Sequence, residues 1–185
     1  RLFHQLPDVI VAAHIAGHPY VSVNLSPNQF RNGAIVEQVA DTVEAAGLDS
    51  RHLRLEITEN LLLDEPEAVR DALHRLKALG IGIYIDDFGK GYSSLNYLRT
   101  FPFDTLKIDR SFIGNLTEEK QHVALVEAIT TIARNFGMDT IAEGVETAGQ
   151  LDLLRSLGCS HIQGFLFHRP QPASQIDTLL GTNPV

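Results

Sequence analysis

The feature that most constrains the fold is a regular alternation of short apolar strands with helical stretches. Six strand candidates recur along the chain, at residues 20–25, 52–57, 81–86, 104–109, 138–143 and 161–165. Their starts lie about 20 to 35 residues apart, which is the spacing of βα units, and such units run their strands parallel through crossover helices. The chain is therefore predicted to belong to the α/β class.

Helix signals fall between these strands. Ser26-Pro27-Asn28-Gln29 and Thr147-Ala148-Gly149-Gln150 both have the pattern of a capping box, the first with proline at the opening helical position. Glycines stand where the intervening helices should end, at Gly47, Gly80, Gly137 and Gly158. No low-complexity linker interrupts the series, so residues 1–185 are predicted to form one domain.

Repeated βα units build either an open, doubly wound sheet or a closed barrel. A Gly-x-Gly-x-x-Gly turn after the first strand, which would favour a dinucleotide-binding sheet, is absent. Instead, each strand has a polar residue at or near its C-terminal end, opposite its apolar face: Asn24, Glu56, Asp86, Lys107, Glu143 and Gln163. In parallel barrels that face points inward, and the C-terminal strand ends carry the active site. We therefore expect a TIM-like (β/α) barrel; scattered helix caps and buried hydrogen bonds are the alternative interpretation.

The charges of these residues indicate the chemistry. Glu56, Asp86, Asp87 and Glu143 would crowd carboxylates that destabilise the fold unless they are neutralised. The chain has 15 basic and 23 acidic side chains, for a net charge of −8, so a phosphate-handling site would need divalent metal as its positive charge. Oxygen ligands suit Mg²⁺ or Mn²⁺, and two such ions can stabilise the attacking and leaving oxygens of phosphodiester hydrolysis. Lys107 would hold the attacking water or the phosphate.

The composition argues against several other classes. A net charge of −8 disfavours a duplex nucleic-acid binder. Cys159 is the single cysteine, which rules out an internal disulfide and a cysteine-only zinc site and is compatible with a reducing compartment. No run of 18 apolar residues occurs, so this segment is not expected to contact or cross a membrane. We interpret the chain as cytoplasmic, either alone or as the cytoplasmic domain of a larger, membrane-anchored protein.

The segment DDFGKGYSS (86–94) resembles the EAL-domain family, bacterial phosphodiesterases that open cyclic di-GMP to linear pGpG. Further family motifs occur in order along essentially the whole chain: SVNLSPNQF (22–30), LEITE (55–59), FDTLKIDRSF (103–112), IAEGVET (141–147) and QGFLFHRP (163–170). The resemblance implies hydrolysis of cyclic di-GMP with two Mg²⁺ or Mn²⁺ ions. A catalytically inactive cyclic di-GMP receptor and an interaction scaffold without ligand are the alternatives.

The resemblance also implies roles for the polar residues at the strand ends. The implied metal ligands are Asn24, Glu56, Asp86 and Asp87. Lys107 would position the nucleophilic water, and Glu143 would complete the acidic cluster. Gln163 would hydrogen-bond a water or ligand, and Gln29 is a further candidate for substrate contact.

Other implied roles belong to loops. Glu59 would brace the loop at residues 86–94, which is also expected to contribute to a homodimer contact; a solvent-facing helix start is the alternative for Glu59. Asp109 would contact the substrate, with an ion pair to Arg110 or Lys107 as its alternative. Lys90, on the same glycine-containing loop, is expected to be solvated.

One departure from the family pattern concerns the N-terminal part of the domain. The family is named for a Glu-Ala-Leu motif on an early strand whose glutamate is a metal ligand, and no Glu-Ala-Leu occurs here. Family chains carry two further strands and a helix before the point where this sequence starts, and residues 1–17 resemble the helix leading into SVNLS. The sequence thus supplies six of eight expected strands. Either upstream residues are omitted or the domain is truncated, and the intact acidic cluster favours omission.

Overall fold

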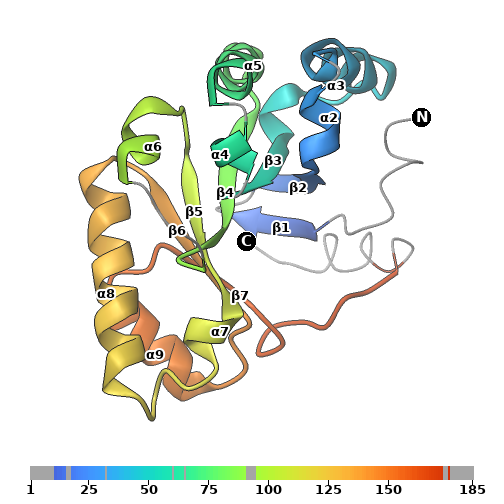
Figure 1. The fold of residues 1–185 in the computed structure, drawn as a ribbon. Coiled ribbons are helices and arrows are strands. Elements are labelled where there is room, and N and C mark those ends of the chain that lie inside the picture. Colours follow the sequence, from blue (N-terminus) through green and yellow to red (C-terminus); the bar gives the residue numbers. More distant parts are fainter. Residues whose placement is uncertain are drawn as a thin grey trace.

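The computed structural model describes residues 11–15, 18–31, 33–59, 61–64, 66–90, 95–172 and 175. A single sheet organises the described part of the chain, with its strands side by side in chain order (Figure 1). The strands are β1 (Val11–Ile15), β2 (His18–Leu25), β3 (Leu53–Thr58), β4 (Gly82–Phe88), β5 (Thr105–Ile108), β6 (Asp139–Glu143) and β7 (His161–Gln163). Strands β2 to β7 are parallel, as predicted, and together they form a half-barrel.

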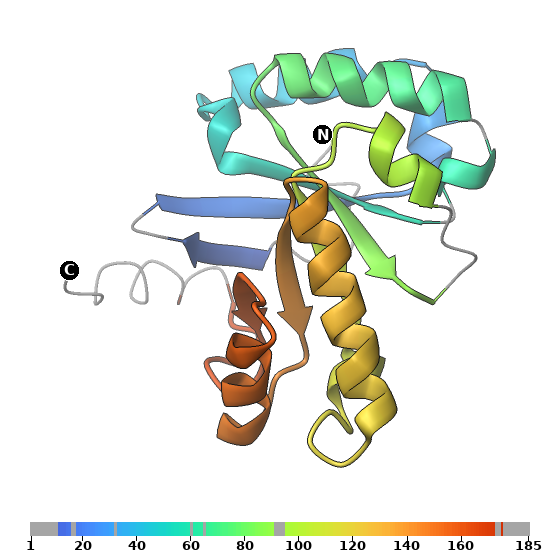
Figure 2. The same cartoon turned by 90° about the vertical axis from the view of Figure 1, so that its left-hand side faces the viewer.

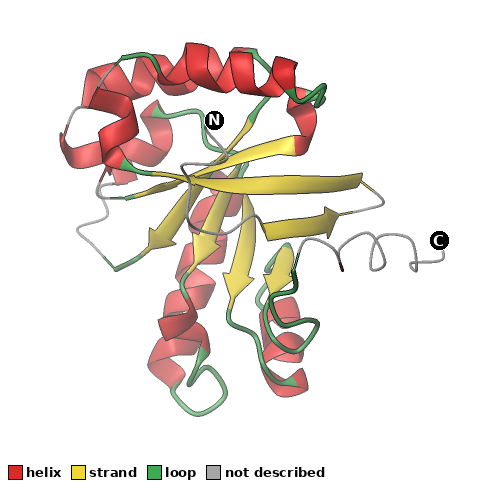
Figure 3. Cartoon of the chain, turned by 90° about the vertical axis from the view of Figure 1, so that its right-hand side faces the viewer, coloured by secondary structure: helices red, strands yellow, loops and turns green. Residues whose placement is uncertain are grey.

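Helices connect the strands and cover the outside of the half-barrel. They are α2 (Pro27–Arg31), α3 (Ile35–Ala45), the 3₁₀ turn η1 (Ser50–His52), α4 (Leu61–Asp64), α5 (Pro66–Ala78), α6 (Leu95–Thr100), α7 (Arg110–Ile113), α8 (Lys120–Asn135) and α9 (Ala148–Ser156). Helices α3 and α5 lie together over the strands β2 to β4, whereas α8 packs along β5 and β6 (Figures 1 and 2). Figure 3, coloured by type of element, shows the described helices outside the curve of the strands.

The two faces of the strands differ as the sequence predicts. Apolar side chains such as Leu55, Ile83, Ile85 and Leu106 are almost fully buried in one large cluster with the helices. The neighbouring positions on each strand point the other way, into the half-barrel, because successive side chains of a strand alternate. That inner face holds polar and aromatic residues, among them Tyr20, Arg54, Glu56, Tyr84, Asp86 and Lys107.

Of the two predicted capping boxes, one is complete in the structure and the other is present in part. Thr147 and Gln150 form a complete capping box at the start of α9. At α2 half of the box is present: the Gln29 side-chain oxygen accepts from Ser26 N at 2.7 Å and from Ser26 Oγ at 3.1 Å, while Gln29 N donates to the Ser26 carbonyl. The four glycines predicted to end helices all have positive φ, between 60° and 85°.

The prediction of a helix over residues 1–17 is wrong for residues 11–15. These residues form β1, which pairs antiparallel with β2 from Val11↔Ser22 to Ile15↔His18. The ladder satisfies backbone groups along the free edge of β2, and this non-local pairing outweighs any local helical preference. Residues 1–10, 16 and 17 lie outside the described part of the chain.

Candidate active site

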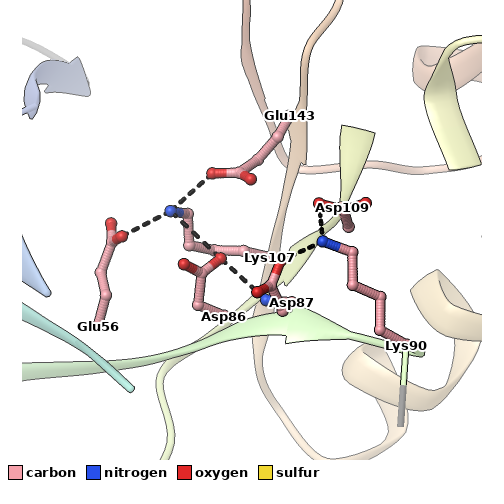
Figure 4. Close-up of polar contacts among 7 residues, drawn as sticks. All are labelled: Glu56, Asp86, Asp87, Lys90, Lys107, Asp109 and Glu143. Atoms are coloured by element: carbon pink, nitrogen blue, oxygen red, sulfur yellow. Dashed lines mark hydrogen bonds and ion pairs between the residues drawn. The ribbon is translucent and has the colours of Figure 1, made fainter. Parts of the chain in front are cut away.

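Four charged side chains from four adjacent strands meet inside the half-barrel. The Lys107 ammonium on β5 lies 2.6 Å from Glu56 Oε2 of β3 and 2.6 Å from Glu143 Oε1 of β6. Asp86 Oδ1 of β4 is 3.5 Å from the same nitrogen (Figure 4). Lys107 and Glu56 are only 3% and 4% exposed. The predicted convergence at the C-terminal rim is therefore present for these four residues.

This cluster contains more negative than positive charges, with three carboxylates around one ammonium. Burial alone would lower the pKa of Lys107, but the charges of Glu56, Glu143 and Asp86 outweigh burial and raise it, so the side chain stays an ammonium. Burial raises the pKa of both Asp86 and Glu143, and the charge of Lys107 offsets this effect only in part. One buried cation thus faces three carboxylates that it does not fully neutralise.

A bulge in β4 separates the two consecutive aspartates. The pairing of β4 with β5 shifts register between Ile85 and Phe88, and Asp87 has φ 57°, which is unusual for a residue other than glycine. Asp87 N donates to Asp86 Oδ1 at 2.9 Å. As a result Asp86 faces Lys107, whereas Asp87 faces Lys90, whose nitrogen lies 2.7 Å from Asp87 Oδ1 (Figure 4).

Lys90 joins Asp87 to Asp109 at the end of β5. Its nitrogen is 2.8 Å from Asp109 Oδ2, while Asp109 Oδ1 accepts from Ser111 N at 2.8 Å and caps α7. Burial would raise the pKa of Asp109, but Lys90 and Ser111 lower it overall. The ion pair with Arg110 or Lys107, which was the alternative given for Asp109, names the wrong partner, since the lysine paired with Asp109 is Lys90. Lys90 is exposed, as expected, with 48% of its side chain accessible, and it also forms these two ion pairs.

The remaining predicted residues lie at different distances from the cluster. Asn24 is exposed at the end of β2 and pairs in register with Glu56, and Gln163 of β7 pairs with Glu143. Glu59 follows β3 directly and is 5% exposed, so a solvent-facing position is excluded. The loop that it was predicted to brace includes residues 91–94, which lie outside the described ranges. The Gln29 side-chain oxygen is engaged in the cap of α2 rather than in this cluster.

A layer of aromatic and basic side chains forms the floor beneath the carboxylates, and the sequence analysis did not identify it. The Arg54 guanidinium lies 5.1 Å from the Tyr20 ring centre, and Arg54 Nε donates to the Tyr84 hydroxyl at 3.1 Å. Gly82 leaves room for this arginine, because a Cβ there would lie 2.3 Å from Arg54 Cδ. The alternation of Tyr20, Arg54 and Tyr84 on inward positions was the available signal.

Comparison with known proteins shows the family of the chain. The family model described as the EAL domain matches residues 4–170. The chain belongs to the EAL domain family. It is 44% identical over 156 residues to the bifunctional diguanylate cyclase/cyclic di-GMP phosphodiesterase MucR of Pseudomonas aeruginosa, which is 84% of this chain and 23% of that protein. It is 40% identical over 169 residues to the cyclic di-GMP phosphodiesterase NbdA of the same organism, covering 90% of this chain and 22% of NbdA.

Solved structures of EAL proteins share the fold. The PaMucR phosphodiesterase in complex with c-di-GMP superposes with a TM-score of 0.81 at 43% identity, over 85% of this chain and 64% of that one. The manganese/cy-diGMP complex of Klebsiella pneumoniae BlrP1 gives a TM-score of 0.76 at 32% identity, over 82% of this chain and 39% of that one. A divalent cation and the cyclic dinucleotide thus occur together in an EAL relative.

The chain spans less than a quarter of the length of MucR and NbdA, at 23% and 22%. Among the described helices of the chain, none is both long and apolar enough to cross a membrane.

Proposed function

We propose that this EAL domain hydrolyses cyclic di-GMP to linear pGpG with the help of two divalent cations, Mg²⁺ or Mn²⁺. The observation that carries the proposal is the Lys107 ammonium held by Glu56, Glu143 and Asp86 at the C-terminal rim. MucR and NbdA, which share 40% or more of the aligned residues, are named as cyclic di-GMP phosphodiesterases.

The residues present fit divalent cations by their chemistry. Three carboxylates surround one ammonium, and burial raises the pKa of Asp86 and Glu143 by more than the charge of Lys107 lowers it. Within the described ranges, no three acidic, histidine or cysteine side chains are already arranged around a common metal position. Lys107 lies between three of the carboxylates and Lys90 holds Asp87, so these side chains would turn to bind metal. The proposed ligands are Asn24, Glu56, Asp86 and Asp87.

Each side chain of the cluster has a role in the proposed hydrolysis. Bound cations would activate water and stabilise the oxygens at phosphorus. Lys107 stays protonated and donates hydrogen bonds to the attacking water or to a phosphate oxygen. Glu143, whose pKa is raised, is suited to accept the proton of that water. The water oxygen bonds to phosphorus, one P–O ester bond breaks, and the released alkoxide takes up a proton to leave linear pGpG.

Further proposals concern the surroundings of the cluster. Gln163 pairs with Glu143 at the rim, where it would hydrogen-bond a site water or the ligand. Glu59 is buried next to β3 and would brace the loop that follows β4. Asp109 and Gln29 have other bonds in this structure, and substrate contact by either would require that these bonds exchange. A homodimer through residues 86–94 and a cytoplasmic location are also part of the proposal.

A non-catalytic cyclic di-GMP receptor is the second candidate. It is favoured by one observation: the three proposed carboxylate ligands, Glu56, Asp86 and Asp87, already have ion-pair partners within the chain, in Lys107 and Lys90. A receptor with this arrangement would bind the nucleotide and signal its presence without turnover.

Incubation of the purified chain with cyclic di-GMP and Mn²⁺, followed by chromatography of the nucleotides, separates the two candidates. The phosphodiesterase proposal predicts linear pGpG, its loss on addition of EDTA, and a loss of at least about a hundredfold in rate in Asp86→Asn. Binding of cyclic di-GMP by calorimetry without any pGpG would support the receptor. Unchanged hydrolysis in Asp86→Asn would refute the assignment of this cluster.

A further inference from the structure

Two lysines form ion pairs with different acidic residues of the rim. Lys107 is buried and holds the carboxylates that point into the half-barrel. Lys90 has 48% of its side chain exposed, and it holds Asp87 on the other side of the β4 bulge. Asp86 and Asp87 are neighbours in the chain, yet each forms an ion pair with a different lysine (Figure 4).

The two partners of Lys90 differ in their freedom to move. The Asp109 side chain is 6% exposed, and its second oxygen caps α7 through Ser111 N. The Asp87 side chain is 42% exposed. Asp109 is therefore held in place by the surrounding structure. Lys90 links it to the more exposed Asp87 and restrains the Asp87 carboxylate.

From this arrangement we infer that Lys90 is a positioning residue that competes with divalent cations for Asp87. The inference rests on the proposed function, because it takes Asp87 as a metal ligand. Cations can gain the Asp87 carboxylate only if its ion pair with Lys90 breaks, and the ammonium also repels a cation bound nearby. Loss of the Lys90 charge therefore strengthens metal binding, whereas loss of a true ligand weakens it.

The probe is Mn²⁺ alone, titrated into the metal-free chain and followed by electron paramagnetic resonance of the free ion. Lys90→Met removes the charge and keeps much of the aliphatic stem, and it should lower the Mn²⁺ concentration at half-saturation about three- to fivefold, as expected for loss of a partly exposed ion-pair network. Lys90→Arg keeps the charge and should bind Mn²⁺ within about twofold of the parent chain.

A matched control is available at the opposite end of the strands. Lys77 has 39% of its side chain exposed and forms an ion pair with Asp104, which precedes β5. Lys77→Met removes a comparable charge far from the rim and should leave Mn²⁺ affinity unchanged. An equal gain in both methionine variants would show a general effect of net charge and would overturn the inference.

The outcomes distinguish this inference from the proposed function. If neither the parent chain nor Lys90→Met binds Mn²⁺, the metal site itself is wrong and the inference is overturned with it. If the parent chain binds Mn²⁺ and Lys90→Met binds it equally or more weakly, only the role of Lys90 is wrong. Tighter Mn²⁺ binding in Lys90→Met, together with parent-like Mn²⁺ binding in Lys90→Arg, supports the competition between Lys90 and divalent cations for Asp87.

Discussion

At the scale of single residues, Lys107 is the group on which the site depends. Its ammonium is buried among Glu56, Glu143 and Asp86, and it is the cation that makes their burial tolerable. Lys107→Met would leave three carboxylates without this partner. We expect the free energy of unfolding of the metal-free protein to fall by about 3–5 kcal/mol, measured by urea denaturation at neutral pH.

The control for this experiment is Lys77→Met, which removes a partly exposed ion pair and should cost no more than about 1 kcal/mol. A Lys107→Met protein as stable as this control would show that the carboxylates are neutralised in another way.

Glu143 predicts a pH dependence of stability. Burial raises its pKa in the folded protein, so the folded state binds this proton more tightly than the unfolded state does. Stability is then lost as pH rises from the unfolded value, about 4.3, through the raised folded value. Thermal unfolding in EDTA should therefore show that Glu143→Gln gains stability relative to the parent chain as pH rises above about 4.3. A difference that stays constant, or that shrinks, over this range would contradict the assigned direction.

At the scale of elements, the contact between the segment that follows β7 and the loop that follows β6 depends on one glycine, Gly164. A Cβ at Gly164 would lie 2.1 Å from the Val145 carbonyl oxygen and 2.3 Å from Val145 N. That backbone cannot retreat easily, because Val145 N donates to the Gln163 carbonyl and Val145 O accepts from Leu166 N. Gly164→Ala should destabilise the protein by about 1–3 kcal/mol and displace Gln163 from the rim, as measured by urea denaturation and by crystallography.

The matched substitution is Gly149→Ala in the first turn of α9. Its nearest contact would be Thr117 Cγ2 at 3.7 Å, which is ordinary packing. Since alanine favours a helix more than glycine does, this variant should be neutral or more stable by up to about 1 kcal/mol. Equal effects of the two alanines would show that the close approach at Val145 is not what constrains Gly164.

The elements also show where sequence reasoning succeeds. The strands β2 to β7 were predicted within a few residues, because alternation of apolar and polar residues is a local signal. The strand β1 was missed, because its conformation comes from pairing with β2 rather than from its own five residues. The ion pair between Lys90 and Asp109 was missed because the chain reverses at Asp87 in a left-handed conformation, and an aspartate in the sequence signals such a conformation only weakly.

At the scale of the whole molecule, the predicted rim is present for Glu56, Asp86, Lys107 and Glu143. The sequence predicted that these residues lie on the inner face of their strands, near the C-terminal ends. Parallel pairing of the strands brings them together. Asp87 and Gln29 deviate, because a backbone bulge and a helix cap, respectively, redirect their side chains. Where the backbone is irregular, the direction of a side chain depends on the local φ and ψ angles. The alternation of apolar and polar residues does not predict these angles.

We expect divalent cations to bind at this rim, among carboxylates contributed by separate strands. Crystals grown with Mn²⁺, measured near the manganese absorption edge, would locate the ions by their anomalous scattering. We expect anomalous peaks within about 2–3 Å of oxygens of Glu56, Asp86 and Asp87, with Lys90 turned away from Asp87. Peaks confined to other parts of the surface, with Lys107 and Lys90 still bound to the same carboxylates, would contradict it.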